Sequence, residues 1–262
     1  MLSTILPNRA ALAACSLAVL SLLASGCSST TTSTAGYGAL ISASQPVRLG
    51  GEYDAGRARR NAIMSARATG EQIDYDQAYA ARMDGDVNVV AFPWQKMNSK
   101  YLRQQVRYFG QEPVGTIVVD ANQKFLYLVQ EDGLAMRYGI AVGKEGFGWT
   151  GNSVVQWKQK WPTWTPPADM IARKPELAKY AEGLAGSPEN PLGARAMYLY
   201  KNGKDTMYRI HGTDKPFSIG KAASSGCFRM INQDVMDLYD RVGGRPAVYV
   251  RDHVTQVAEL GR

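Results

Sequence analysis

From Gly115 onward, short apolar runs separated by turn-forming residues dominate the chain and predict β-strands. Only a few residues separate the first three runs, as in antiparallel hairpins. Asn202-Gly203 favours the tight turn of a further hairpin. The expected strands lie at 115–120, 124–129, 136–142, 154–157, 196–200, 206–211 and 247–250. This pattern predicts a mostly β domain whose strands pair mainly in the antiparallel sense.

Two segments show helical patterning. One helix is expected to begin at Asn232 as its N-cap, because the apolar residues within 235–242 then share one face. A shorter helix is expected to start at Pro175 and to stop at Gly183. We therefore expect a β domain over about 115–252 with one or two helices packed against it.

Patterning is weaker ahead of this domain and after it. Residues 27–90 carry no convincing apolar stripe, although 57–60 and 78–82 have helix-forming composition. We expect a tether and a flexible or loosely helical linker there. Aromatic residues return within 91–114, which predicts a lead-in segment that packs on the domain. The polar end, 253–262, is expected to be a C-terminal tail.

The chain begins with a pattern typical of export. Residues 10–24 carry no charge and follow Arg9, and they fall short of the roughly 20 residues that span a bilayer. We therefore predict a signal peptide over 1–26. The sequence Leu22-Leu23-Ala24-Ser25-Gly26-Cys27 resembles the lipobox of bacterial lipoproteins, which implies that Cys27 carries lipid. The alternative is ordinary secretory cleavage nearby, with Cys27 incidental.

The residues after Cys27 favour the lipoprotein. Every residue from Ser28 to Thr34 is Ser or Thr, which is typical of a flexible tether. In a Gram-negative cell, Ser28 rather than Asp after a lipidated cysteine favours delivery to the outer membrane. We expect a periplasmic protein held by lipid on the inner leaflet of that membrane.

Composition excludes several classes of protein. The 262 residues have a hydrophobic share of 45% and a charged share of 20%, which fits neither a disordered chain nor a multi-pass membrane protein. The net charge of +7 would suit an anionic partner, and export excludes nucleic acid as that partner. Three cysteines and two histidines make neither a disulfide framework nor a histidine-rich metal site, so no metal is expected.

One glycine motif is interpreted as a loop. Residues 146–151 match the G-x-G-x-x-G pattern of dinucleotide-binding proteins. Such a site needs a helix to follow, so that the helix N-terminus meets the pyrophosphate. Here the strand-like residues 152–155 follow instead.

Cys227 and His211 are the candidate catalytic residues. Cys227 is the only thiol left once the leader is removed and Cys27 is lipidated, and it follows small residues in the turn 224–229. His211 lies sixteen residues earlier, and a histidine beside a thiol is the usual means of generating a thiolate. The alternative for Cys227 is a small buried hydrophobe. His253 is assigned no role.

These residues also carry a family resemblance. One motif consists of His211-Gly212-Thr213, a sixteen-residue gap and Ser224-x-Gly226-Cys227-x-Arg229. Further characteristic segments are Gly115–Val119, Trp164–Pro167, Asn190–Ala196 and Gly243–Val248. Over about 115–251 this pattern resembles L,D-transpeptidases of the YkuD family, which implies an antiparallel β-sandwich-like catalytic domain.

The resemblance implies a catalytic role for each matching residue. Cys227 would attack the carbonyl of the third residue of a peptidoglycan tetrapeptide stem, forming a thioester and expelling D-Ala. His211 would be the base, oriented by the backbone carbonyl of Gly212. The backbone N–H groups of Gly226 and Cys227 would hold the oxyanion.

Three further positions are expected to serve substrate binding. Arg229 would contact a carboxylate of the stem, or alternatively form a structural ion pair. Ser224 matches the Ser/Thr of the family motif and would support the loop. Ser225 stands where the commonest motif has histidine, which leaves the shape of the acceptor side open.

The acceptor and the roles of the tryptophans are left open by the sequence. A transpeptidase would pass the acyl group to an amine, making a 3→3 cross-link or attaching an outer-membrane protein to the wall. Water as acceptor would make the protein a carboxypeptidase or hydrolase, and a non-catalytic wall lipoprotein is a third alternative. Core packing rather than a place in the cleft is expected for Trp149, Trp157, Trp161 and Trp164.

Overall fold

The computed structural model describes residues 70–143, 149–224, 226–252, 254 and 257–259. The expected signal peptide, the lipidation site at Cys27, the Ser/Thr tether and the segment 57–60 lie outside the described residues. Within the described part, no helix has both the length and the apolar character needed to cross a membrane.

Strands make up most of the described chain. The strands are β1 (Arg82–Asp84), β2 (Val87–Val89), β3 (Gln104–Tyr108), β4 (Ile117–Asp120), β5 (Phe125–Val129), β6 (Leu134–Gly139), β7 (Val142–Gly143), β8 (Gly151–Lys160), β9 (Arg195–Lys201), β10 (Lys204–His211), β11 (Ala222–Ser224), β12 (Phe228–Arg229), β13 (Ala247–Arg251) and β14 (Val257–Glu259). The α-helices are α2 (Tyr75–Ala78), α3 (Ala168–Arg173) and α4 (Asn232–Arg241). Short 3-10 turns are η1 (Trp94–Lys96), η2 (Ser99–Tyr101), η3 (Glu131–Gly133), η5 (Pro175–Tyr180) and η6 (Pro216–Ser218).

Most of these strands belong to one sheet. In the described part of the chain the sheet has ten strands in the order β12-β10-β9-β8-β13-β4-β5-β6-β3-β14. Neighbouring strands pair antiparallel except β13 with β4 and β10 with β12, which pair parallel. The expectation of a mostly antiparallel β fold is therefore confirmed.

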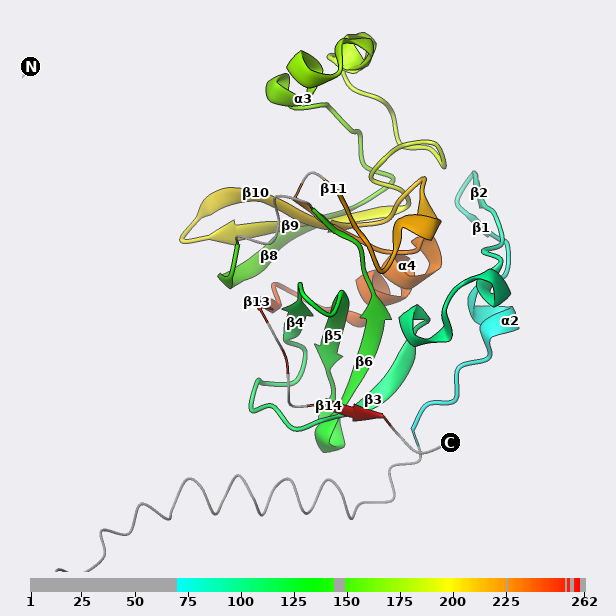
Figure 1. Cartoon of the computed structure of the whole chain (residues 1–262), viewed down its shortest axis with the longest axis vertical. Helices are drawn as coiled ribbons and strands as arrows, with labels where there is room; N and C mark the ends of the chain where they lie inside the picture. Colours follow the sequence, from blue (N-terminus) through cyan, green and yellow to red (C-terminus); the bar gives the residue numbers. More distant parts are fainter. Residues whose placement is uncertain (1–69, 144–148, 225, 253, 255–256, 260–262) are drawn as a thin grey trace, which may run out of the picture. The chain divides into compact units, whose positions relative to one another are not determined.

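The sheet folds over on itself, so that its two halves enclose one core. Figure 1 shows β8, β9 and β10 as one group and β4, β5 and β6 as a second group. Val155 and Leu199 from the first group and Ile117 and Leu126 from the second belong to the same cluster of fully buried side chains, together with Leu238 of α4. This arrangement is the β-sandwich that the sequence predicted.

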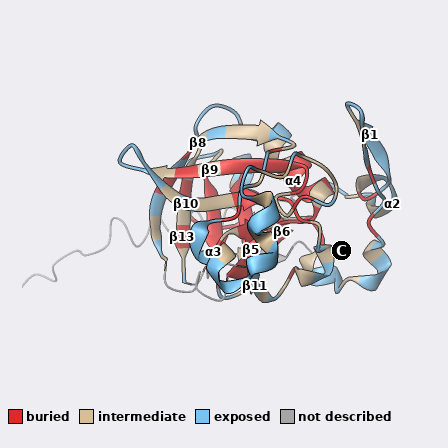
Figure 2. Ribbon diagram, turned by 90° about the horizontal axis from the view of Figure 1, so that it is seen from above, coloured by how far each residue is buried: buried red, intermediate tan, exposed pale blue. Residues whose placement is uncertain are grey.

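The strands β4 and β5 are buried on both faces. Alternate residues of β5 enter two different cores: Leu126 and Leu128 face the core shared with α4, whereas Phe125 and Tyr127 face a second cluster. This double burial explains why the sequence there reads as a continuous apolar run. Figure 2 shows the buried residues gathered in the middle strands, with α3 and β1 exposed on the outside.

Several local predictions are confirmed. Asn202 and Gly203 have φ values of 51° and 76°, as a tight hairpin turn between β9 and β10 requires. Helix α4 ends at Arg241, just before the glycine pair at 243–244. However, Ile231 rather than Asn232 occupies its N-cap, so the predicted N-cap was wrong by one residue. The expected helix from Pro175 is a 3-10 segment.

The segment 70–90 differs from the expected flexible linker. Helix α2 ends at Ala78, and Arg82 opens a β-hairpin instead of continuing a helix. Gly85, with φ of 65°, forms the turn of that hairpin. Tyr79 is only 1% exposed, because the segment packs against the catalytic domain, and no local pattern can show this.

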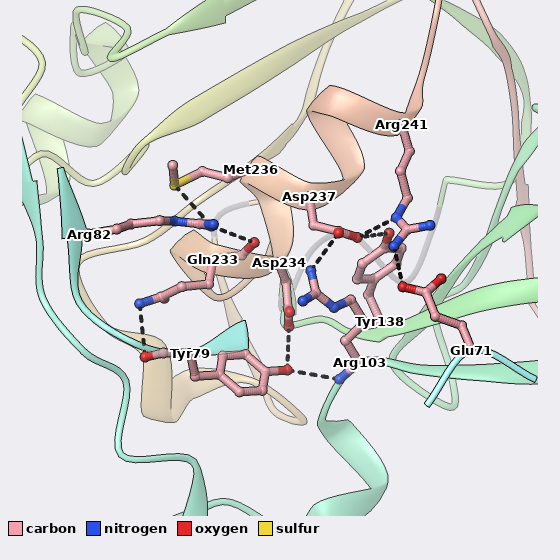
Figure 3. Close-up of polar contacts among 10 residues, drawn as sticks. All are labelled: Glu71, Tyr79, Arg82, Arg103, Tyr138, Gln233, Asp234, Met236, Asp237 and Arg241. Atoms are coloured by element: carbon pink, nitrogen blue, oxygen red, sulfur yellow. Dashed lines mark hydrogen bonds and ion pairs between the residues drawn. The ribbon is translucent and has the colours of Figure 1, made fainter. Parts of the chain in front are cut away.

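A set of polar contacts, buried at Tyr79 and Asp234, fastens this segment to α4, and we call it the Asp234 network. Its members are Glu71, Tyr79, Arg82, Arg103, Tyr138, Gln233, Asp234, Met236, Asp237 and Arg241, as Figure 3 shows. The Tyr79 hydroxyl donates to Asp234 Oδ2 at 3.3 Å and accepts from the backbone N–H of Arg103 at 2.9 Å. Gln233 donates to the backbone oxygen of Val90 at 2.9 Å.

Asp237 is the second centre of the Asp234 network. Its carboxylate forms an ion pair with Arg103 at 2.8 Å and accepts hydrogen bonds from the Tyr138 hydroxyl at 2.6 Å and from Arg241 Nε at 2.8 Å. Arg241 also contacts Glu71 at 2.8 Å. The residues ahead of the catalytic domain are therefore bound to α4 by hydrogen bonds and ion pairs.

The chain end also takes part in the sheet, although we expected a polar tail. Strand β14 pairs antiparallel with β3, which itself pairs with β6. The backbone N–H of the buried Val254 donates to Asp120 Oδ2 at 2.8 Å. Val254 and Val257 pack on the second core, so apolar contacts hold this end of the chain in place.

Candidate active site

The pairing of β10 with β12 determines which side chains share a face of the sheet. Ile210 lies beside Phe228, and His211 lies beside Arg229. Paired residues of parallel strands point to the same face, and successive residues point to opposite faces. Because Ile210 and Phe228 are in the core, His211 and Arg229 lie on the other face.

The same register places Cys227 on the face that carries His211. Cys227 directly precedes Phe228, so extending the register by one residue beyond β12 sets it opposite Arg209, two positions before His211 on β10. On adjacent strands, positions offset by two residues have Cα atoms roughly 8 Å apart. The extended register thus places on one face of the sheet the two residues that the sequence singled out.

Cys227 is half-buried at the end of a glycine turn. Its Sγ lies 3.8 Å from the backbone oxygen of Met207. Gly226 has φ of 129°, a conformation that strains residues with a Cβ. The face of Gly226 that would carry a Cβ looks onto the Tyr208 ring, at 3.7 Å. The glycine before the cysteine is therefore required by the backbone.

His211 is nearly enclosed, at 4% exposed. Its Nδ1 lies 2.6 Å from the carbonyl oxygen of Gly212. A carbonyl oxygen only accepts hydrogen bonds, so in neutral imidazole Nδ1 carries the proton and Nε2 has the lone pair. The ring therefore has the tautomer that a general base acting through Nε2 requires.

Asn232 holds the turn that follows His211, a role that the sequence did not reveal. Its Oδ1 accepts from the backbone N–H groups of Ala194 at 3.1 Å and Thr213 at 3.2 Å, and its Nδ2 donates to the carbonyl of Thr213 at 3.2 Å. A Cβ on Gly193 or on Gly212 would collide with Asn232 Oδ1. The two glycines thus make room for the amide that fixes this turn.

The surroundings of His211 and Cys227 favour the neutral form of both side chains. Burial, with a smaller effect from the positive charge of Arg229, lowers the pKa of His211 to about 3, although the Gly212 hydrogen bond opposes the shift. Burial also raises the pKa of the Cys227 thiol, against the hydrogen bond and charge of Arg209. Near neutral pH the pair is thus imidazole and thiol, and a proton must move when the sulfur attacks.

Arg229 presents a cation on the same face. Its Nε is buried and has no hydrogen-bond partner among the residues that the structure describes. Burial lowers the pKa of its guanidinium, while Asp214 and Cys227 act in the opposite direction. No ion pair of Arg229 is found in the described part of the chain, so the alternative of a structural ion pair gains no support.

The two serines of the motif are only partly described. Ser224 is the last residue of β11 and pairs with Gly143 of β7. Ser225 lies outside the described residues. The glycine motif 146–151 lies partly outside the described residues, but Gly151 opens strand β8, so the prediction that a strand rather than a helix follows the motif is confirmed.

The expectation that the tryptophans pack in the core was wrong for Trp157, which is 43% exposed. Two residues after the buried Val155, a regular strand would place it in the core. The register of β8 against β9 shifts between Val155 and Trp157, so Val155 faces Leu199 and Trp157 faces Tyr198 on the outer surface. This β-bulge reverses the side on which the ring lies.

The other three tryptophans are half-buried. Trp149 stacks on Tyr208 with ring centroids 4.6 Å apart and packs against the main core. Trp161 donates to Asp84 Oδ2 at 2.7 Å, and its ring contacts the hairpin ahead of the domain rather than the centre of the fold. Trp164 lies 6.1 Å from the Tyr180 ring. Among the described residues no cluster of His, Cys, Asp or Glu could hold a metal ion.

Several known proteins resemble this chain. Probable L,D-transpeptidase ErfK/SrfK of Escherichia coli is 34% identical over 134 residues, which are 49% of this chain and 41% of that protein. Probable L,D-transpeptidase YbiS of the same species is 30% identical over 133 residues, with the same coverage. The chain therefore matches less than half the length of these relatives.

A solved structure from Brucella melitensis, described as a probable carnitine operon oxidoreductase, is 50% identical to this chain. The match covers 58% of this chain and 94% of that chain, with a TM-score of 0.42. The model of the YkuD family, described as the L,D-transpeptidase catalytic domain, matches residues 115–253, which is over half of the chain. The chain therefore belongs to the YkuD family of L,D-transpeptidase catalytic domains.

Proposed function

We propose that this protein is a peptidoglycan L,D-transpeptidase with Cys227 as nucleophile and His211 as base. The observations that carry the proposal are the pairing of His211 with Arg229, which by extension places Cys227 on the same face, and the contact of the Gly212 carbonyl with His211 Nδ1. That geometry leaves Nε2 as the proton acceptor on the face that carries the thiol.

In the first half-reaction, Cys227 Sγ attacks the carbonyl carbon of the third residue of a tetrapeptide stem. His211 Nε2 takes the thiol proton as the carbon–sulfur bond forms. The backbone N–H groups of Gly226 and Cys227 stabilise the oxyanion. When the peptide bond breaks, His211 returns the proton to the leaving amine, so D-Ala departs and a thioester remains.

The second half-reaction reverses these steps with a new acceptor. An amine attacks the thioester carbon, His211 removes a proton from that amine, and the thiolate leaves and is reprotonated. A side-chain amine of another stem as acceptor would give a 3→3 cross-link, and an amine of an outer-membrane protein would attach that protein to the wall. Water would release the shortened stem. This acyl transfer needs no metal or organic cofactor.

Substrate binding is assigned to Arg229, Ser224 and Ser225, with Ser224 also supporting the loop that carries Cys227. The charge of Arg229 on this face and its buried Nε without a described partner support contact with a stem carboxylate. Carboxylate recognition by a guanidinium would orient the stem before attack.

The proposal includes the organisation of the chain. Residues 1–26 would be the signal peptide, followed by the lipid anchor and the Ser/Thr tether, with lipid on Cys27 holding the protein at the periplasmic side of the outer membrane. Residues 91–114 would form the lead-in segment and 115–252 the catalytic domain. The sequence around Cys27 and the Ser/Thr run support this division.

Mass spectrometry of the products tests the proposal. The chain is incubated with the tetrapeptide, first alone and then with diaminopimelate-containing stems as acceptors. A cross-linked dimer together with released D-Ala is expected, and both should be lost in Cys227→Ala. A shortened stem without a dimer would identify the hydrolase instead. Absence of either product from the unaltered chain would refute the proposed activity.

A further inference from the structure

A row of side chains crosses the outer face of the sheet and ends at Cys227. Trp157 of β8 pairs with Tyr198 of β9, and Tyr198 pairs with Arg209 of β10. Extending the β10–β12 register by one position places Cys227 next to Arg209. Paired positions share a face of the sheet, so all four side chains lie on the same surface.

The aromatic part of this row is fixed in place. The rings of Trp157 and Tyr198 stack with centroids 3.6 Å apart and an angle of 7° between their planes. The Arg209 guanidinium carbon lies 4.5 Å from the Tyr198 ring centroid, and Asp205 binds Arg209 with both carboxylate oxygens at 2.7 Å. The stack therefore needs little further ordering when a ligand arrives.

Trp157 ends this stack and stays 43% exposed. The β-bulge in β8 is what moves this ring out of the core, so a local irregularity of the strand maintains its exposure. The faces of an aromatic ring carry partial negative charge. They match the slightly positive C–H face of a pyranose sugar, whose hydroxyl groups can remain in water at the ring edge.

The spacing of the row fits the substrate of the proposed function. Three steps between strands, each about 4.8 Å, separate Trp157 from Cys227 by roughly 14 Å. The carbonyl that Cys227 would attack lies three residues from the sugar that carries the stem, a span of about 10 Å of extended peptide. The lactyl group that joins peptide and sugar adds a few bonds, so the sugar reaches the position of Trp157.

We propose that Trp157, supported by Tyr198 and Arg209, is a binding site for the N-acetylhexosamine that carries the donor stem. This inference rests on the proposed transpeptidase function and extends it. The protein would then recognise the glycan as well as the peptide, and it would prefer stems that are still attached to sugar.

Paired substrates test this inference. kcat/KM is measured for a disaccharide-tetrapeptide and for the sugar-free tetrapeptide, with the unaltered chain and with Trp157→Ala. We expect Trp157→Ala to lower kcat/KM about tenfold on the disaccharide-tetrapeptide and to leave the sugar-free value unchanged. Trp157→Tyr, which keeps an aromatic face, should recover part of the loss. Val154→Ala, a change at another exposed position of β8, should affect neither substrate.

Two results would overturn the inference. Equal loss on both substrates would mean that Trp157 supports the reaction centre rather than a sugar, and no loss on either would mean that the sugar lies elsewhere. If the unaltered chain acts on neither substrate, the proposed function fails, but the sugar site remains testable by calorimetric titration with a soluble N-acetylglucosamine oligomer. Binding that is lost in Trp157→Ala would uphold the site, and absence of binding would refute it.

Discussion

Two side chains in the first turn of α4 have different roles. Asn232 holds the turn that carries His211, whereas Asp234, two residues later, belongs to the network that binds the segment ahead of the domain. Around Asp234 and Asp237, charged and polar groups contact one another through several elements, as Figure 3 shows. Around His211, neutral groups and backbone contacts determine the geometry.

These two regions show how burial shifts the pKa of a side chain that has few hydrogen-bond or ion-pair partners. Asp237 is contacted by Arg103, Tyr138 and Arg241. Asp234 is fully buried, its Oδ1 has no hydrogen-bond partner among the described residues, and burial raises its pKa to about 7. The same effect lowers the pKa of His211, where the neutral form is the one that catalysis needs.

The largest effect is expected from removing the base. His211→Gln should lower kcat by about 10³-fold, because the thiol then has no positioned proton acceptor. Thermal unfolding should show little change, since the Asp234 network is untouched. Steady-state kinetics beside differential scanning calorimetry measures both. Retention of more than a tenth of the activity would show that another group is the base.

Breaking the Asp234 network should have the opposite result, a loss of stability with little change in kcat. Arg103→Met leaves the partly buried carboxylate of Asp237 with one ion-pair partner fewer, and about 3 kcal/mol of unfolding free energy should be lost. Urea unfolding gives the value, and kcat measured at low temperature should stay near that of the unaltered chain. Arg245→Met, at an exposed arginine, is the matched control. A loss of less than 1 kcal/mol would show that the network contributes little.

Asn232 should affect turnover more than binding. Asn232→Ala removes all three hydrogen bonds to the turn, and we expect kcat to fall about 10- to 100-fold with KM little changed. Asn232→Asp keeps an oxygen acceptor and should lose less. Measurement of kcat and KM separately distinguishes this positioning role from substrate binding.

The pH dependence of kcat/KM also tests whether Asn232 positions the turn that follows His211. In the unaltered chain, His211 has a pKa of about 3 and is neutral above it, so kcat/KM should not fall between pH 7 and pH 5 through protonation of this base. In Asn232→Ala, water should reach a loosened imidazole, its pKa should move toward 6.5, and activity should fall within that range. If the activity of the two proteins depends on pH in the same way below pH 7, the positioning role is contradicted.

The smallest effect is expected from neutralising Asp234. Its pKa is higher in the folded state, about 7, than in the unfolded chain, about 3.8, so the stability that its proton provides is present below pH 3.8 and is lost as the pH rises through 7. Asp234→Asn should therefore raise Tm by a few degrees at pH 8 and leave it nearly unchanged at pH 3.5. Calorimetry at both pH values measures this, and a shift of equal size at both would contradict it.

Local patterns predicted what local interactions determine. The strands from 115 onward, the hairpin turn at Asn202-Gly203 and the extent of α4 follow from residue type and periodicity alone. Cys227 and His211 could be proposed as a pair because few other residues can perform this chemistry. The role of Asn232 could not be predicted, because it depends on two glycines that come close only in the folded chain.

The errors likewise have physical causes. Trp157 was expected to pack in the core with the other three tryptophans, and no pattern of side chains shows a β-bulge before the partner strand is known. The hairpin at 82–89 was expected to be part of a linker because its partners lie on α4, far along the chain. Strand β14 was expected to be a tail for the same reason, since its partner β3 lies far earlier in the sequence.

The bond between Tyr79 and Asp234 joins residues 155 positions apart, and this separation has a consequence for how the molecule forms. A ribosome adds about 5 to 20 residues each second, so Tyr79 waits roughly ten seconds or more before its partner exists. During that interval the first segment can make its local contacts but not those with α4. The Asp234 network can therefore close only when the chain is nearly complete.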